Sequence, residues 1–412
     1  LIKGAKIYIS GGEQSITDNI VHMVLAKIKG APAGVKGISL FIVPKFLVDD
    51  EGNPTERNGV SLAGLIHKLG YRGTTSTALS FGDDAPCHGY LVGEPHQGLK
   101  YMFQMMNEAR VGVGFGAAVI GYRGYMHSLE YAKDRLQGRK ASEKNPESPQ
   151  VPIIDHADVR RMLLAQKAYS EGGLALCLYG ARLMDDQHTH PDEQKRQEAG
   201  KLLDLLTPVI KAWPSEYGPK ANDLAIQVYG GAGYTREYPV EQCWRDNRLN
   251  PIHEGTNGIQ AMDLLGRKIW QDQSHGLQLL MQEMQVDLQA ATTDRCQQWA
   301  LSLSETLQQA VKVTQSLGKS LMEGDPDKTL ANASCYLHLF GHIMVAWMWL
   351  RQANAASHAL GSANTDDERN FYQGKLQAAQ YFFHWELPTV AQDLVLLRNQ
   401  DDTCLNMKSE WF

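Results

Sequence analysis

The sequence predicts an α+β fold, in which a small middle β-barrel or sandwich precedes a helical bundle and a helical C-terminal extension. Two observations predict this order. Residues 1–91 contain short runs rich in β-branched and aromatic residues between turn-forming residues, as strands do. From about residue 97 the apolar residues recur at helical spacing, and this pattern continues to the C-terminus. A chain of 412 residues is long enough for two or three domains.

Strands are expected at residues 5–10, 20–28, 38–43 and 75–81, which are separated by Gly, Pro, Asn and Asp. We assign residues 1–92 to this β-rich domain. The chain begins at Leu1 without a recognisable signal peptide and inside what reads as a strand, so we expect that an N-terminal part is missing.

The helical pattern begins with Met102, Met105, Ala109 and Val113 on one face and continues through the small residues Gly116 and Gly124, which would let helices pack closely. Further helices are expected at residues 156–184, 196–213, 219–229 and 257–273, and the polar stretch 137–152 is expected to be an exposed loop. We assign residues 93–274 to a helical bundle and residues 275–412 to a helical extension. In the extension, His338, Gly341 and His342 interrupt the apolar run 333–350, which favours a buried helix over a membrane span.

Composition and charge exclude several classes of protein. Hydrophobic residues make up 43% and charged residues 21% of the chain, which is typical of a globular protein. The formal net charge of −6 lacks the basic footprint of a nucleic-acid-binding protein. None of the six Cys residues forms a CxxC pair, so neither a zinc site nor a disulfide framework is expected, and a reducing compartment fits better.

One carboxylate, Glu254, lies in a Gly-containing turn between two predicted helices. Asn257 begins the second of these helices, whose N-terminal amides could face an anion or a polar cofactor. Upstream of the turn, Gly231 and Gly233 allow the backbone to approach a bulky group closely. A single Glu at a helix start is most often only a favourable charge at the helix dipole, so the surrounding residues have to decide its role.

These surroundings resemble the acyl-CoA dehydrogenase flavoproteins. That family has a Gln, a Gly-Gly-x-Gly-aromatic turn, a Glu-Tyr-Pro-Val-Glu, an Arg-Asp and a Glu-Gly-Thr in this order. Here they read Gln227, residues 230–234, residues 237–241, Arg245-Asp246 and residues 254–256, and the offset of 27 residues from Gln227 to Glu254 matches the family's common spacing. The extension resembles the family's larger members, in particular the branch that includes 3-(methylthio)propionyl-CoA dehydrogenases.

The resemblance implies the α,β-dehydrogenation of an acyl-CoA thioester with FAD as cofactor. Carried over by motif, Glu254 would remove the α-proton while the β-hydrogen leaves as hydride to flavin N5. Some relatives carry the base directly before a helix Arg, a position that Ala109 holds here, and this favours Glu254. Glu108, one residue from that position, is the alternative base.

The resemblance also implies cofactor contacts. Tyr8 stands where the family has a Trp against the flavin, and Ser10 stands at the family's Thr, whose hydroxyl reaches N5. The subunit's own FAD would further contact Thr256. The FAD of a partner subunit would contact residues in two other motifs: Arg135, Gln137, Gln227 and Gly231. Gly138 replaces a family Phe, so packing at the adenine must differ.

At the substrate, the resemblance places Arg110, His253 and Gly255. For Arg110 the alternative is a helix-surface ion pair, and for His253 it is an ordinary hydrogen-bonded histidine. Tyr234 and Tyr238 are expected in the core or in the substrate wall. The substrate would be 3-(methylthio)propionyl-CoA or a fatty acyl-CoA.

Contacts made in trans imply a homodimer, and an electron-transfer flavoprotein would accept the electrons. We expect neither a metal site nor an integral membrane segment, and we expect the cytoplasm of a bacterium rather than a mitochondrial matrix. Three alternatives stay open: an acyl-CoA oxidase that uses O2, a non-catalytic nucleic-acid-binding flavoprotein of the same fold, and a chain that binds no FAD because its N-terminal part is missing.

Overall fold

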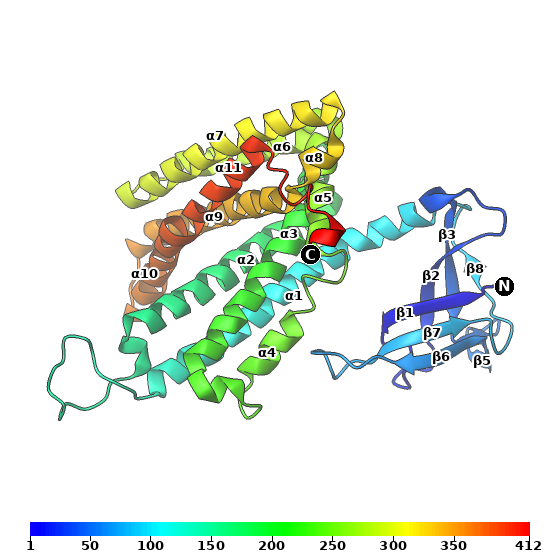
Figure 1. The fold of residues 1–412 in the computed structure, drawn as a ribbon, viewed down its shortest axis with the longest axis horizontal. Coiled ribbons are helices and arrows are strands. Elements are labelled where there is room, and N and C mark those ends of the chain that lie inside the picture. The colour runs from blue at the N-terminus through cyan, green and yellow to red at the C-terminus, as the bar shows by residue number, and fades with distance from the viewer. The chain divides into compact units, whose positions relative to one another are not determined.

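The computed structural model describes residues 1–412 except the side chain of Gln104, and the chain forms two compact units, Leu1–Glu108 and Ala109–Phe412 (Figure 1). Helix α1 (Gly98–Asp134) begins in the first unit and continues in the second. Its first turn packs against a strand so closely that a Cβ on Gly98 would lie 2.4 Å from the carbonyl carbon of Ser39. The start of α1 therefore packs within the first unit. The domain ranges 1–92, 93–274 and 275–412 stay predictions.

The first unit is built from short antiparallel strands. The four strands expected from the sequence are present, as β1 (Gly4–Ser10), β2 (Val21–Lys27), β3 (Ile38–Pro44) and β7 (Ser76–Phe81). Four more, of two to six residues each, were not predicted: β4 (Phe46–Val48), β5 (Pro54–Arg57), β6 (Val60–Leu65) and β8 (Tyr90–Leu91).

The strands form two three-stranded sheets, in the orders β1-β7-β6 and β2-β3-β8, and the pair β4-β5. A short 3-10 turn, Gly34–Gly37, precedes β3. One buried cluster joins the two larger sheets, because it contains Val24 and Val43 from one sheet and Val60, Leu79 and Phe81 from the other. The first unit therefore has a core of its own.

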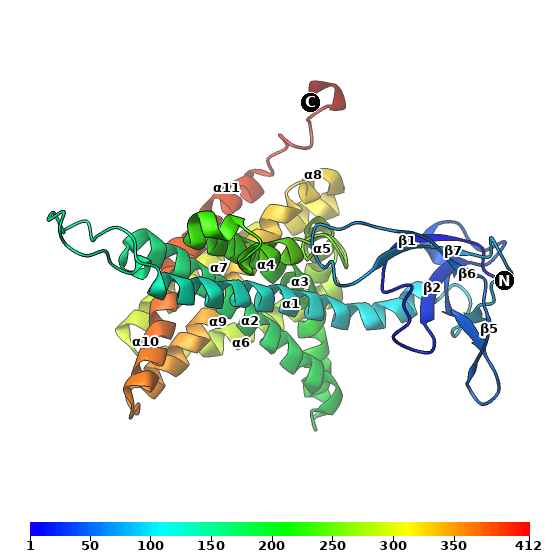
Figure 2. The same cartoon turned by 90° about the horizontal axis from the view of Figure 1, so that it is seen from below.

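The second unit is helical. After α1 it contains the following helices: α2 (Ala157–Thr189), α3 (Glu193–Tyr229), α4 (Val240–Asn247), α5 (Asn257–Gly266), α6 (His275–Gln289), α7 (Asp294–Glu323), α8 (Pro326–Leu330), α9 (Ala333–Leu360), α10 (Asp366–Tyr381) and α11 (Ala391–Asn399). Figure 2 shows α2, α3, α9 and α10 in the same bundle. One buried cluster draws residues from α1, α2, α3, α5, α6, α7, α9, α10 and α11, so the extension shares its core with the preceding helices.

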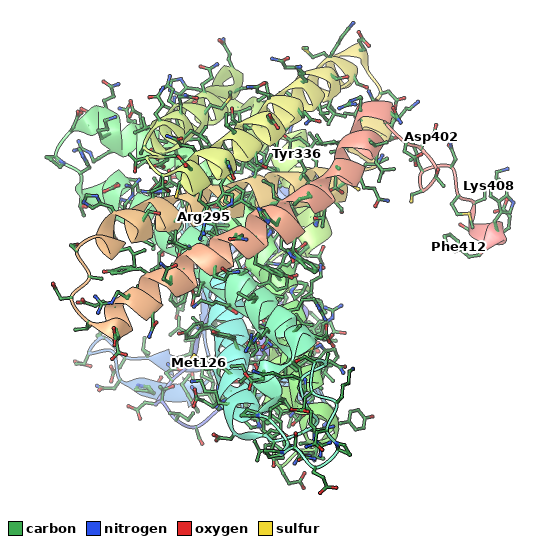
Figure 3. All side chains as sticks on the ribbon, turned by 90° about the vertical axis from the view of Figure 1, so that its left-hand side faces the viewer. Met126, Arg295, Tyr336, Asp402, Lys408 and Phe412 are labelled. Atoms are coloured by element: carbon green, nitrogen blue, oxygen red, sulfur yellow. The ribbon has the colours of Figure 1, made fainter. Side chains whose placement is uncertain are left out.

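Polar contacts also lie inside this shared core. The hydroxyls of Thr314 on α7 and Tyr336 on α9 are 2.9 Å apart, and both side chains are buried. Figure 3 shows Tyr336 beneath the C-terminal helices. The two hydroxyls satisfy one another where water is excluded.

Helix α3 corrects one prediction. The sequence predicts two helices, 196–213 and 219–229, yet α3 is continuous, with Pro208, Pro214 and Pro219 inside it. Pro214 cannot donate to the carbonyl of Ile210. A Cβ on Gly114 of α1 would lie only 2.0 Å from that carbonyl oxygen, so the α1 backbone covers the freed acceptor. Close C–H···O contact of this kind offsets part of the lost hydrogen bond.

Two other expectations are refined. The helix predicted for residues 257–273 ends at Gly266, and a 3-10 segment, Lys268–Ser274, follows it with left-handed residues that include Asp272 and Gln273. Of the two glycines that were expected to allow close packing, Gly124 lies against Asn222 of α3, whereas nothing surrounds the position of a Cβ on Gly116.

Helix α9 is the core helix of the extension. By length and composition it could cross a membrane, but 83% of its most apolar window is buried among the other helices. His342 is completely buried in this helix, between the rings of Trp213 and Phe382. Its Nδ1 lies 2.9 Å from the carbonyl oxygen of His338, and its Nε2 has no partner among the described residues.

Burial, reinforced by the charge of His338, lowers the pKa of His342 from 6.5 to about 3. Because the folded pKa lies below the unfolded one, stability is lost as the pH falls from about 6.5 toward 3. The loss amounts to about 3 kcal/mol at pH 4. We expect His342→Phe to flatten this dependence, whereas the same change at the exposed His384 should not. Urea unfolding at pH 7 and pH 4 measures the free energy of unfolding of both variants. An unchanged pH dependence of this free energy in His342→Phe would contradict the assignment.

Candidate active site

Glu254 lies on an exposed turn between α4 and α5, in a conformation that ordinary residues avoid. Its φ is 55° and that of Gly255 is 83°, so both are left-handed. For a residue other than glycine this costs on the order of 1–2 kcal/mol. The buried Gln260 holds the turn, because its Nε2 donates to the carbonyl oxygens of Glu254 at 3.2 Å and Gly255 at 3.3 Å. Backbone strain that the surroundings maintain around an exposed carboxylate is typical of a functional site.

Three more predicted residues belong to this turn or border it. Thr256 is the N-cap of α5, and its hydroxyl accepts a hydrogen bond from the amide of Ile259 at 3.4 Å. His253 is half-buried, and its Nδ1 lies 3.2 Å from the carbonyl oxygen of Leu249, as expected of an ordinary hydrogen-bonded histidine. At Gly255, an added Cβ would lie 2.6 Å from Gln260 Nε2, so the turn requires glycine there.

Arg110 is buried rather than on the helix surface. It is 5% exposed, and its guanidinium on α1 lies 3.6 Å from a carboxylate oxygen of Asp263 on α5. Arg267 binds the other oxygen of Asp263 at 2.7 Å, so two arginines share this carboxylate. Arg110 thus forms the ion pair that was the alternative for it, but inside the bundle rather than on the helix surface, and it is anchored to the helix that begins just after Glu254.

Lys211 is a residue near this turn that sequence reasoning missed. It lies in the middle of α3, it is completely buried, and its Nζ donates to Oδ1 of Asn257 at 3.2 Å. Burial, with a smaller contribution from Arg110, lowers its pKa to about 8, while Glu254 acts in the opposite direction. A lysine within an otherwise apolar stretch of a predicted helix was the one signal available in the sequence.

The residues expected at a partner's FAD lie near one end of the bundle. The aromatic rings of Tyr131 on α1 and Tyr229 on α3 stack at 4.0 Å, and Tyr238 packs at their edge. This contact brings together the C-terminal ends of α1 and α3, which carry four exposed candidates: Arg135, Gln137, Gln227 and Gly231. By contrast, Tyr234, which was expected in the core or the substrate wall, is 90% exposed.

In the first unit, Tyr8 and Ser10 lie on β1. Tyr8 is 71% exposed and has a φ of 63°, where the register with β7 shifts between Lys6 and Ile9. Ser10 is exposed and lines a cavity of about 430 Å³ together with Ile9 and His22. An exposed aromatic ring and a hydroxyl are therefore available on this strand.

These features fit the flavin dinucleotide that the resemblance implies. Tyr8 offers a free ring plane, and Arg135 offers an exposed planar donor for a pyrophosphate. An added Cβ on Gly231 would meet nothing within 4 Å, so its backbone is open to a ligand. The chain therefore holds three separate groups of candidates: the Glu254 turn, the ends of α1 and α3, and β1.

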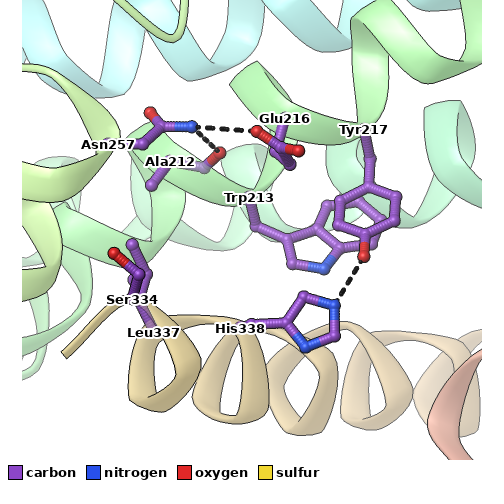
Figure 4. Close-up of a pocket in the computed structure, with 8 residues that line it drawn as sticks. All are labelled: Ala212, Trp213, Glu216, Tyr217, Asn257, Ser334, Leu337 and His338. Atoms are coloured by element: carbon purple, nitrogen blue, oxygen red, sulfur yellow. Dashed lines mark hydrogen bonds between the residues drawn. The ribbon is translucent and has the colours of Figure 1, made fainter. Parts of the chain in front are cut away.

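A further cavity of about 270 Å³ lies between α3, α5 and α9 (Figure 4). Its wall includes Asn257, whose Nδ2 lies 3.5 Å from a carboxylate oxygen of Glu216. Across the cavity the hydroxyl of Tyr217 lies 2.8 Å from Nε2 of His338, and His338 Nδ1 lies 2.6 Å from Asp393. Asn257 therefore links this cavity to Lys211.

Two family models match the chain in succession. Residues 96–269 match the acyl-CoA dehydrogenase C-terminal domain, and residues 280–408 match the family described as acetyl-CoA dehydrogenase C-terminal like.

Two curated relatives match nearly the whole chain. The 3-methylmercaptopropionyl-CoA dehydrogenase of Ruegeria pomeroyi is 36% identical over 387 residues, which are 92% of this chain and 63% of that protein. The broad-specificity linear acyl-CoA dehydrogenase of Mycobacterium tuberculosis is 35% identical over 424 residues, which are 100% of this chain and 69% of that protein. The chain thus spans about two thirds of the length of these relatives.

Two solved structures share the fold. Caenorhabditis elegans ACDH-11 in complex with C11-CoA superposes with a TM-score of 0.76 at 19% identity, over 100% of this chain and 60% of that one. The acyl-CoA dehydrogenase of Bacillus anthracis complexed with FAD gives 0.72 at 20% identity, over 96% and 63% of the two chains.

Proposed function

Because the chain belongs to the acyl-CoA dehydrogenase family, we propose that it catalyses the FAD-dependent α,β-dehydrogenation of an acyl-CoA thioester to the 2-enoyl-CoA. The observation that carries this proposal is the Glu254 turn. A carboxylate is exposed there, in a left-handed conformation that Gln260 maintains, directly before the N-terminus of α5.

In the proposed reaction, Glu254 acts as the general base. The α-carbon loses its proton, and a new O–H bond forms on the Glu254 carboxylate. When bound, FAD supplies the acceptor for the β-hydrogen, which leaves as hydride, so that a double bond remains between the α- and β-carbons. The positive end of the α5 dipole and the backbone N–H of Glu254 can stabilise negative charge that develops on the thioester oxygen.

The residues that would hold FAD come from three places. Tyr8, Ser10 and Thr256 would contact the chain's own cofactor, and Arg110, His253 and Gly255 would surround the acyl-CoA. The exposed group at the ends of α1 and α3 would contact the cofactor of a second copy: Arg135, Gln137, Gln227 and Gly231. This division supports a homodimer as the working form, and an electron-transfer flavoprotein as the electron acceptor fits the family.

For the substrate we propose a short linear acyl-CoA, with 3-(methylthio)propionyl-CoA as the first compound to try. Three curated relatives support this range, since their names specify 3-methylmercaptopropionyl-CoA, linear acyl-CoA and butyryl-CoA. A bacterial cytoplasm is the compartment we propose for this reaction.

The reaction is tested with the purified protein, FAD, an acceptor dye and a panel of acyl-CoAs. We expect dye reduction with a short acyl-CoA, and mass spectrometry should show a product that lacks two hydrogens. Equal formation of peroxide under air would instead identify an oxidase. No product from any thioester, although FAD is bound, would contradict the proposed function.

A further inference from the structure

Lys211 is completely buried, and burying a lysine in this way costs free energy of folding. Its amine lies inside the bundle on α3, flanked along the helix by the buried residues Ile210 and Ala212, and the structure gives it one hydrogen bond, to Oδ1 of Asn257. A charged amine that loses its water in this way lowers stability unless strong partners replace the water. The neutral oxygen of Asn257 is a weak replacement for a carboxylate.

The charged groups that act on Lys211 come from two neighbouring elements. Arg110 on α1 repels it, and Glu254 on the turn before α5 attracts it. Asp263 on α5 is already shared by Arg110 and Arg267. On α3 itself, Glu216 pairs with Lys220 at 3.2 Å. Glu254 is therefore the carboxylate that favours the ammonium form of Lys211.

The position of Asn257 connects Lys211 to the base. Asn257 is the first residue of α5 and follows Glu254 by three positions. Its amide N–H donates to the carbonyl oxygen of Pro251 at 3.0 Å, which closes the turn that contains Glu254. The hydrogen bond from Lys211, in the middle of α3, to the side chain of Asn257 therefore holds the C-terminal end of this turn.

We propose that Lys211 is a positioning residue for Glu254, which holds the Glu254 turn through its hydrogen bond to the side chain of Asn257. The inference rests on the proposed function, because it assigns Glu254 as the base.

The first test measures the effect of Glu254 on Lys211 and needs no activity. Lysine is labelled with carbon-13 at Cε in the full chain, and the Lys211 resonance is identified by its absence in Lys211→Met. We expect it to titrate with a pKa of about 8. Because the attraction is lost, we expect its midpoint to fall in Glu254→Gln. Glu198→Gln, which removes a carboxylate of α3 that pairs with Lys195 at 2.7 Å, should leave it in place. An equal midpoint in the wild type and in Glu254→Gln would overturn the inference.

The second test separates positioning from a purely structural role. We expect Lys211→Met to keep or raise the melting temperature at pH 7, since it removes a buried charge, yet to lower kcat with less change in KM, because Asn257 loses its hydrogen bond to α3. Lys211→Gln removes the charge and retains a donor for Asn257, so it should keep more of the wild-type kcat than Lys211→Met. Lys268→Met is the matched control, because Lys268 is also buried but is paired with Asp204.

The outcomes distinguish this inference from the proposed function. If Lys268→Met keeps the wild-type kcat, folded Lys211→Met loses kcat and Lys211→Gln recovers part of it, the inference holds. A wild-type kcat in folded Lys211→Met overturns it. If the wild type turns over no acyl-CoA, the proposed function fails, and the Lys211 titration still decides whether the two residues are coupled.

Discussion

Replacing Glu254 by Gln is expected to reduce turnover by about 10²–10⁴-fold, the usual contribution of a general base. The amide keeps the size of the carboxylate but cannot accept a proton from the α-carbon. Since the turn is held by Gln260 through the main-chain carbonyls of Glu254 and Gly255, the substitution leaves its conformation intact. FAD content and melting temperature should therefore stay close to the wild-type values, and steady-state dye reduction measures the loss.

Glu108→Gln is the matched control. Glu108 is also an exposed glutamate, and it is one residue from the position that carries the base in some relatives. We expect it to retain most of the activity. If Glu108→Gln is inactive while Glu254→Gln turns over normally, the base has been misassigned, although the family membership would stand.

Gly114→Ala is expected to destabilise the bundle by about 1–3 kcal/mol, as overpacking of a core does. Its Cβ would lie 2.0 Å from the backbone oxygen of Ile210, which cannot rotate away as a flexible side chain would. Helices α1 and α3 would have to move apart at this contact. Arg110 on α1 and Lys211 on α3 lie close to the contact in the sequence. Urea unfolding at pH 7 measures the change.

Gly112→Ala provides the control on the same helix, two residues earlier. Nothing lies within 4 Å of the position of its Cβ, and the residue is exposed. Since alanine is the better helix former, this variant should gain about 0.5–1 kcal/mol. Two glycine-to-alanine changes of opposite sign would show that the crossing of α1 and α3, rather than helix propensity, sets the requirement. Equal effects of the two substitutions on the free energy of unfolding would contradict the close approach of α1 to α3 at Gly114.

Much of the fold could be predicted because local patterns agree with the final structure. The strands with clear β-branched runs, such as β2 and β3, begin and end within one residue of their predicted bounds. The exposed strand β5, with the sequence Pro-Thr-Glu-Arg, has no such pattern and forms only because β4 pairs with it. Helix α3 was divided in the prediction because the proximity of Gly114 to Ile210, which makes Pro214 tolerable, is a long-range contact.

Only part of the candidate site could be predicted from the sequence, for the same reason. Motif order was enough to single out Glu254, Gly255 and Thr256, which the structure places in one turn. The left-handed conformation of Glu254 and its support by Gln260 are consequences of tertiary packing, and no local pattern encodes them. Lys211 is 43 residues from Glu254 in the sequence, so only the folded bundle reveals its hydrogen bond to Asn257, at the end of the Glu254 turn.

The most direct measurement is an anaerobic absorbance titration of the FAD-loaded protein with a panel of acyl-CoAs that includes 3-(methylthio)propionyl-CoA and butyryl-CoA. The proposed function predicts that a short linear thioester bleaches the visible band of the oxidised flavin in a single turnover, and that Glu254→Gln abolishes the bleaching. A flavin that stays oxidised with every thioester would contradict α,β-dehydrogenation by this protein.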